Sequence, residues 1–242
     1  MKQMLIYEQV TPVSVEQHGK HAWEAPAGFD FARHTNSVPV MAQEFSLAAM
    51  HYPIVFGQAN DGVVPAVVLG VRDSENVFVG KDGSWDAQYI PAFIRRYPFV
   101  FGTDGKSDTF TLMVDEGAAG FKKNGKGEKL FDDKGGQTDF LKNVLTFLGE
   151  YQAQSQLTQA FCKLISDLGL LEVSEAHVPL PNDPERRLNG FQMVNREKLQ
   201  NLPAEKVAEL NKSGALELIH LHLFSLNNLM RLQEKMAKAA TS

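Results

Sequence analysis

Short apolar runs separated by turn residues dominate the first part of the chain. Five runs are rich in valine, phenylalanine and isoleucine and are bounded by glycine, aspartate or asparagine: 52–58, 63–71, 76–80, 99–102 and 110–116. This pattern is typical of β-strands. Segments 60–62 and 104–105 consist of Asn, Asp and Gly, which accept the backbone angles of a chain reversal, and we expect turns there. The amino-terminal part therefore predicts a largely antiparallel sheet.

From Thr138 onward the apolar residues recur at helical spacing. Thr138 is a suitable N-cap, Asp139 follows in the first turn, and the apolar spacing continues to Leu168. We expect one long helix or two stacked helices that end at Gly169. Segment 172–187 contains too much proline for a helix, and 190–195 predicts a strand.

Two further helices are predicted at the carboxy-terminal end, at 197–211 and from about 215 to 238. Between Leu216 and Leu226 the second helix is apolar in nearly every direction, whereas a surface helix shows one apolar stripe. Its first part should therefore be buried on several sides.

Together these patterns predict an α+β fold, in which a largely antiparallel N-terminal sheet with short helices packs against a C-terminal helical layer. The character of the sequence changes near 134–138, which divides the chain into a sheet-rich half, 1–135, and a helix-rich half, 136–242. Because no low-complexity linker separates the halves, we expect one integrated unit.

Composition narrows the possible partners. Hydrophobic residues make up 43% and charged residues 22% of the chain, which suits a compact globular protein. The net charge is −5 and the chain has no block of basic residues, so we do not expect it to bind nucleic acid. We see no apolar run of about 20 residues and no signal peptide, and Cys162 is the only cysteine. A buried reduced thiol and a cytoplasmic location are expected, with export lacking a signal peptide left open.

Two adjacent arginines lie within the aromatic segment "YIPAFIRRYPFVF", residues 89–101. Pro91 suits a helix start and Pro98 disfavours helix at Tyr97, so about two turns are expected. In that helix Arg96 lies about 60° from the face shared by Tyr89 and Phe93, and Arg95 points elsewhere.

Two roles are open for this pair. Arg96 can stack on a tyrosine or phenylalanine and pair with Asp82, Asp86 or Asp104 as a structural clamp, which we favour. Alternatively, the arginines hold a carboxylate or phosphate ligand.

Histidine pairs provide the candidate metal ligands. Glu44 and His51 share a face in a helix-like run, but no third ligand lies at a usual spacing. His220 and His222 diverge by about 200° on a helix, so only one can face a given site. We expect His220, with Asn227 and Arg231, to form a satisfied polar seam in the core, a ligand pocket being the alternative.

The remaining motifs are weak. His18 and His21, with Glu24 beyond, resemble a fragment of a metal site, but a surface loop is the better interpretation. The chain contains neither a phosphate-binding glycine motif nor a G-x-S-x-G nucleophile. The sequence thus offers no catalytic motif, and no cofactor is expected.

Several longer segments carry a family resemblance. They include "VPVMAQEF", "YPIVFG", "NVFVGKDGSWDAQYIPAFIRRYPF", "LNGFQMVNREKLQNL" and "LNKSGALELIHLHLFSLNNLMRL". Over about residues 36 to 233 the chain resembles the SapC-like bacterial proteins. The resemblance implies an association with bacterial surface layers and supplies no catalytic residue. Permease labels sometimes attached to the name conflict with the lack of membrane spans.

These observations favour an intracellular SapC-like accessory or binding protein, linked to surface-layer or nutrient-uptake systems. The candidate ligand-binding residues are Trp85, Tyr89, Arg95, Arg96 and Glu44. The expected partner is an unidentified protein or a small anionic ligand. The sequence leaves open whether the protein forms a homo-oligomer. The alternative is a metal-dependent enzyme whose ligands, such as Glu44, His51 and His220, converge from distant segments.

Overall fold

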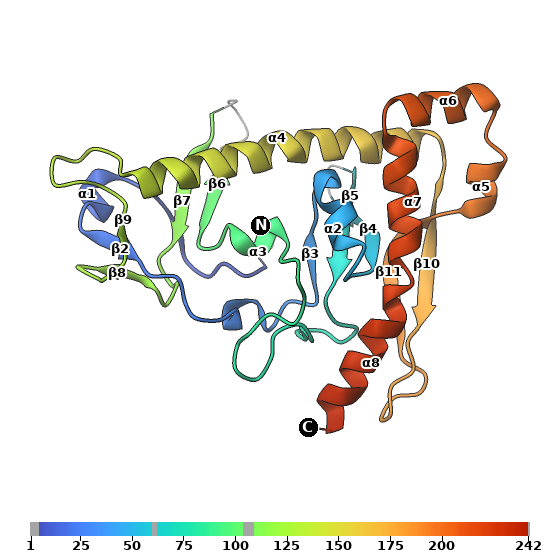
Figure 1. Ribbon diagram of the computed structural model, residues 1–242, viewed down its shortest axis with the longest axis horizontal. Helices are drawn as coiled ribbons and strands as arrows, with labels where there is room; N and C mark the ends of the chain where they lie inside the picture. Colours follow the sequence, from blue (N-terminus) through green and yellow to red (C-terminus); the bar gives the residue numbers. More distant parts are fainter. Residues whose placement is uncertain (1–4, 60–61, 104–108, 242) are drawn as a thin grey trace.

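A single long helix, α4 (Asp139–Asp167), runs along the molecule, and the sheets lie on one side of it (Figure 1). The computed structural model describes residues 5–59, 62–103 and 109–241. The Thr138 hydroxyl accepts a hydrogen bond from the Leu141 amide at 3.3 Å, which caps the helix start. With 29 residues the helix is roughly 45 Å long. The apolar spacing therefore encodes one helix rather than two stacked ones.

Three antiparallel sheets lie beneath α4. The largest has the order β10-β11-β4-β5-β3, so it takes strands from both sides of residue 135. Its strands are β10 (Leu171–His177), β11 (Arg187–Val194), β4 (Ile54–Ala59), β5 (Gly62–Val68) and β3 (Ser37–Pro39). The second sheet contains β1 (Val10–Pro12), β7 (Thr111–Asp115) and β6 (Phe99–Gly102), and the third contains β8 (Phe121–Lys123), β2 (His21–Trp23) and β9 (Glu128–Lys129). The α+β class and the antiparallel pairing agree with the prediction.

Short helices connect and cover these sheets. Before α4 these are α1 (Val15–His18), η1 (Asp30–Ala32), η2 (Ala42–Glu44), α2 (Phe45–Ala48) and α3 (Ala92–Arg95). After it come α5 (Arg196–Gln200), α6 (Ala204–Lys212), α7 (Ala215–Ser225) and α8 (Asn228–Thr241). Figure 1 shows α7 and α8 following one another beside the large sheet.

Both predicted C-terminal helices are broken in the structure. The expected helix 197–211 divides into α5 and α6 at Pro203, which has no N–H to donate inside a helix. The expected helix 215–238 divides at residues 226–227, where polar side chains compete for the backbone. There Asn227 donates to the Phe224 carbonyl at 3.0 Å, and Asn228 donates to the Ala49 carbonyl at 2.7 Å.

One predicted strand is also absent. Segment 76–80 forms no ladder, since its only bridge joins Val79 to Trp85. The carbonyls of Val79 and Gly80 instead accept hydrogen bonds from Arg33 at 3.2 and 2.8 Å. The predicted turns at 60–61 and 104–105 lie outside the described residues.

The helix α4 covers two separate groups of buried side chains. Its first half packs with the smaller core, which includes Trp23, Phe99 and Phe121. Its second half contributes Phe161 and Ile165 to the main core beneath the large sheet. Because one helix and one sheet join 1–135 to 136–242, we propose that the two halves fold as one unit.

A buried histidine connects α7 to the large sheet. His222 has no exposed surface, its Nδ1 donates to the Ile54 carbonyl at 2.8 Å, and its Nε2 accepts from the Val194 amide at 3.1 Å. The Ser225 hydroxyl accepts from the Ile54 amide at 2.9 Å. The expected seam of His220, Asn227 and Arg231 is therefore wrong, because all three are exposed, and His222 and Ser225 form a buried polar seam instead. Of the other residues expected in the seam, Arg231 donates to the Met50 carbonyl at 2.9 Å.

Substitution of His222 tests this seam. His222→Ala leaves the Ile54 carbonyl and the Val194 amide without partners, so the free energy of unfolding should fall by about 2 to 4 kcal/mol. His220→Ala, the matched control, should change it by less than about 0.5 kcal/mol. Urea unfolding measures both values, and equal effects would contradict the assignment.

The free energy of unfolding should also depend on pH through His222. Burial lowers the pKa of His222 to about 4, below the ordinary value of 6.5. The unfolded chain therefore binds a proton that the folded protein excludes, and this contribution to stability is lost as pH falls from about 6.5 to about 4. Over this range the wild type should lose about 3 kcal/mol more than His222→Gln.

The same unfolding experiments test whether the two halves of the chain unfold together. Trp23 and Trp85 report on the first half, and far-ultraviolet circular dichroism reports mainly on the helices of the second. Coincident transitions are expected if 1–135 and 136–242 form one unit, and separated transitions would contradict it.

Candidate functional site

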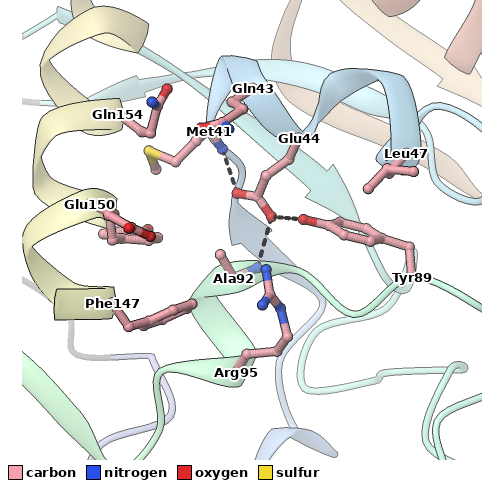
Figure 2. Close-up of a pocket in the computed structure, with 11 residues that line it drawn as sticks. Met41, Gln43, Glu44, Leu47, Tyr89, Ala92, Arg95, Phe147, Glu150 and Gln154 are labelled. Carbon is pink, nitrogen blue, oxygen red and sulfur yellow. Dashed lines mark hydrogen bonds between the residues drawn. The ribbon is translucent and has the colours of Figure 1, made fainter. Parts of the chain in front are cut away.

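Three of the five candidate ligand-binding residues meet at one cavity. Glu44, Tyr89 and Arg95 line a hollow of about 360 Å³ between η2–α2, α3 and α4 (Figure 2). The α4 wall is formed by side chains at helical spacing, among them Phe147, Glu150, Tyr151 and Gln154. The cavity is therefore built from three segments that are distant in sequence.

Glu44 holds two of these segments together. Its side chain is buried, and its Oε1 accepts from the Tyr89 hydroxyl at 2.6 Å and from the Ala92 amide at 2.7 Å. Its Oε2 accepts from the Met41 amide at 2.8 Å. The Ala92 amide belongs to the first turn of α3. The positive end of the helix dipole there also stabilises the negative charge of the carboxylate. Glu44 thus positions α3 and Tyr89.

Tyr89 remains a proton donor in this arrangement. Burial, followed by the hydrogen bond to Glu44 and the charge of that carboxylate, raises the pKa of Tyr89. The phenol consequently stays protonated at neutral pH. Its ring forms one wall of the cavity (Figure 2).

Arg95 brings a positive charge to the cavity. Its side chain is exposed, and its Nε donates to the Ile90 carbonyl at 3.0 Å. The guanidinium carbon lies 5.9 Å from the Tyr89 ring centre and 5.4 Å from that of Phe147. Figure 2 shows the group extending toward Glu44. The two aromatic rings therefore orient the Arg95 guanidinium, and its Nε is already used in the hydrogen bond to Ile90.

Arg96 lies among different neighbours. Its guanidinium carbon is 4.2 Å from the Phe93 ring centre and 4.8 Å from that of Tyr151, and its Nε donates to the Tyr7 hydroxyl at 3.1 Å. Burial raises the pKa of Tyr7 to about 12, although Arg96 opposes the shift. The arginine thus connects α3 to α4 and to the amino-terminal segment through aromatic side chains.

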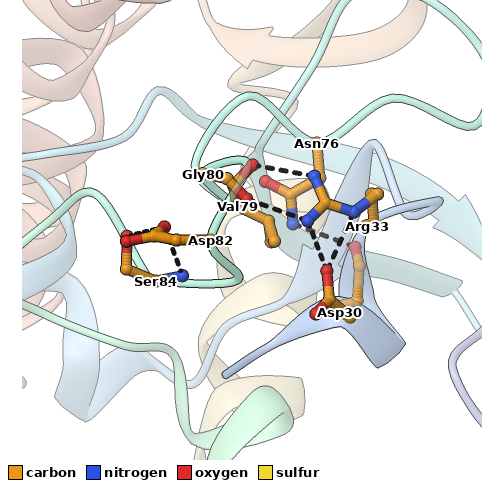
Figure 3. Close-up of polar contacts among 8 residues, drawn as sticks. Asp30, Arg33, Asn76, Val79, Gly80, Asp82 and Ser84 are labelled. Carbon is orange, nitrogen blue, oxygen red and sulfur yellow. Dashed lines mark hydrogen bonds and ion pairs between the residues drawn. The ribbon is translucent and has the colours of Figure 1, made fainter. Parts of the chain in front are cut away.

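Two of the three carboxylates expected beside Arg96 have other partners. Asp82 accepts from the Ser84 amide at 3.0 Å and from its hydroxyl at 2.6 Å, in a loop whose Gly80 carbonyl accepts from Arg33 (Figure 3). Asp86 pairs with Lys235, and Asp104 lies outside the described residues. Among the described residues, the phenol of Tyr7 is the hydrogen-bond acceptor of Arg96 Nε.

Trp85 does not line the cavity. Its ring packs on Phe29 and Phe78, with ring centres 5.5 and 6.3 Å away. Its Nε1 donates to the Tyr52 hydroxyl at 2.7 Å, and that hydroxyl donates to the Tyr89 carbonyl. Trp85 therefore acts on the cavity only by supporting the backbone of Tyr89.

The three residues of the alternative metal site do not converge. Glu44 faces α3, whereas His51 lines a different hollow beside Arg231, and His220 is exposed on α7. Burial and then the charge of Arg231 lower the pKa of His51. Within 5–59, 62–103 and 109–241, no three histidine, cysteine or acidic side chains are grouped as metal ligands.

His18 is not in a surface loop, contrary to expectation. Its side chain is fully buried, Nδ1 accepts from the Ser14 amide at 3.2 Å, and Nε2 lies 2.9 Å from Glu116 Oε1. Both ring nitrogens are therefore used to hold α1. Ser14 as the N-cap of α1 was the signal in the sequence, because it places His18 four residues on.

Sequence reasoning missed the α4 side of the cavity. Phe147, Glu150, Tyr151 and Gln154 fall within the helical segment that begins at Thr138, and none is among the candidate residues from the sequence. The sequence does contain a signal: Glu150 lies three residues after Phe147, and Gln154 lies three residues after Tyr151 and four after Glu150. At these spacings polar and aromatic side chains share one face of the helix.

Comparison with known proteins adds a family assignment. A family model described as SapC matches residues 13–232. The chain belongs to the SapC family. The resemblance predicted over about 36 to 233 is therefore confirmed, and the match begins earlier, at residue 13. No curated protein and no solved structure gave a significant match. In the part of this SapC protein that the structure describes, no helix has the length and apolar character to cross a membrane.

Substitution of the two arginines should separate their roles. Arg96→Ala should lower the free energy of unfolding by on the order of 1 to 3 kcal/mol more than Arg95→Ala, because Arg96 is packed between aromatic rings and bonded to Tyr7. Urea unfolding measures the difference. Equal, negligible losses for both variants would argue against a structural role for Arg96.

Proposed function

We propose that this SapC-family protein is an intracellular accessory protein that acts by binding, and that the cavity holds a ligand bearing a carboxylate. The observation that carries the proposal is the Arg95 guanidinium, which lies between two aromatic rings at the cavity wall. A planar guanidinium binds a carboxylate through two parallel hydrogen bonds. Because Nε already donates to Ile90, the two terminal nitrogens are the edge offered to a ligand.

The acidic side chains of the cavity are compatible with this ligand. Both oxygens of Glu44 already accept hydrogen bonds from three protein donors. Glu150 is exposed, so solvent and salt screen its charge. Among the described lining residues, Arg95 is the only lysine or arginine.

The biological setting belongs to the same proposal. The link to surface-layer or nutrient-uptake systems rests on the family resemblance. The cytoplasm suits Cys162, since this thiol is buried and burial raises its pKa to about 12, which keeps it protonated and unreactive.

A small aromatic acid tests the cavity. 3-Phenylpropionate should shift the amide resonances of residues around Arg95 and Phe147 in nuclear magnetic resonance titrations, whereas 3-phenylpropionamide should bind at least tenfold more weakly. Arg95→Gln should remove the preference for the acid, because the amide side chain cannot supply the charge.

Lys206→Gln is the control of equal charge change, since this lysine lies exposed on α6 and pairs with Glu209. It should leave the titration unaltered. Equal affinity for acid and amide in the wild-type protein, or the same loss in Lys206→Gln, would refute the carboxylate site.

A further inference from the structure

The cavity continues along α4 into a second hollow. This hollow, of about 480 Å³, shares Gln43 and Gln154 with the first. Its α4 wall includes Leu157 and Leu164, and the start of α7 closes the opposite side with Leu218. None of its described lining residues is charged. The two hollows therefore adjoin at these glutamines, and we refer to them together as the groove, which is apolar over its second part.

The groove carries its positive charge at one end and is open to solvent. At the charged end the exposed Arg95 has its guanidinium carbon 5.9 Å from the Tyr89 ring centre and 5.4 Å from that of Phe147. At the other end Leu157 is 62% exposed, so the apolar wall faces solvent. From Phe147 to Leu164 the helix advances roughly 25 Å, which is the length of about seven extended residues.

We propose that this groove binds the carboxy-terminal end of a protein partner as an extended chain. The inference rests on the proposed carboxylate site. The terminal carboxylate lies against Arg95, which Tyr89 and Phe147 flank. The amides of Gln43 and Gln154 face the adjoining peptide groups, and apolar side chains pack against Leu157, Leu164 and Leu218.

The polarity of the groove distinguishes a peptide from a simple alkyl acid. Gln43 and Gln154 lie between its charged end and its apolar part, and an amide side chain both donates to and accepts from a peptide bond. An alkyl chain offers these amides nothing. A peptide also suits a groove open to solvent, because alternate side chains can point outward into water.

Charge explains the direction of the bound chain. A carboxylate at the Arg95 end gains a bidentate ion pair, and the uncharged second hollow favours apolar residues preceding it. Glu150 opposes this weakly from an exposed position. Glu150→Gln should therefore strengthen binding by a few fold at low salt and by less at high salt.

The test uses a fluorescein-labelled heptapeptide of leucine and alanine with a free carboxy terminus, and the same peptide as its carboxamide. Fluorescence anisotropy should show at least tenfold tighter binding of the free acid. The difference should disappear in Arg95→Gln. Leu157→Glu should weaken both peptides at least tenfold, since it places a charge in the apolar part.

Phe224→Glu is the matched control, because Phe224 is 60% exposed on α7 and lies outside the groove. It should leave both affinities unchanged, and the 3-phenylpropionate titration should be unaffected by Leu157→Glu.

Each failure has a separate meaning. If 3-phenylpropionate binds through Arg95 but the peptide acid and amide bind equally, or Leu157→Glu has no effect, the peptide inference is overturned and the carboxylate site stands. Decanoate binding more tightly than the peptide also overturns it, in favour of an alkyl acid. If neither acid binds, both proposals fail.

Discussion

The arrangement of the site depends on one buried carboxylate. A buried charge is costly unless hydrogen bonds satisfy it, and Glu44 meets this requirement with donors from Met41, Tyr89 and Ala92. These donors fix η2 against the start of α3. Arg95 lies one turn into α3, so Glu44 indirectly determines where the guanidinium is held. The acidic residue organises the cavity and leaves the basic one available to a ligand.

Two further constraints make this geometry rigid. The helix α4 spans both cores, and its Phe147 and Tyr151 contact the two arginines. At α7, His222 and Ser225 satisfy backbone groups of Ile54 in the large sheet that would otherwise be buried without partners. Cavity walls formed by packed helices retain their shape without a ligand, which lowers the cost of ordering on binding.

Local patterns predicted the long helix and several strands, whereas β10 and the short strands β1, β2, β3, β8 and β9 were not predicted. Alternating apolar runs gave β4 and β5, and the capped periodic stretch gave α4. Two interruptions were predictable only in part. Pro203 is a clear helix breaker, but nothing in the apolar pattern before Asn227 marks the end of α7. Segment 76–80 has strand composition, but the Asn76 side chain accepts from the Phe78 amide and Arg33 donates to the Val79 and Gly80 carbonyls, which together hold it as a loop.

The site was harder to predict because its contacts are long-range. The sequence identified Glu44, Tyr89 and Arg95 as polar or aromatic candidates, but Glu44 meets Tyr89 across 45 positions of sequence. Helical geometry showed that His220 and His222 face opposite ways and could not show which one is buried. The tyrosine partner of Arg96 lies 89 residues away, and no local spacing could have indicated it.

The most direct measurement is the free energy of unfolding of Glu44→Gln. An amide at this position directs N–H toward at least one of the three donors that now bind the carboxylate, so the variant should lose about 2 to 4 kcal/mol in urea unfolding. Unchanged stability together with loss of 3-phenylpropionate binding would contradict the account, because Glu44 would then contact the ligand instead of holding the cavity together.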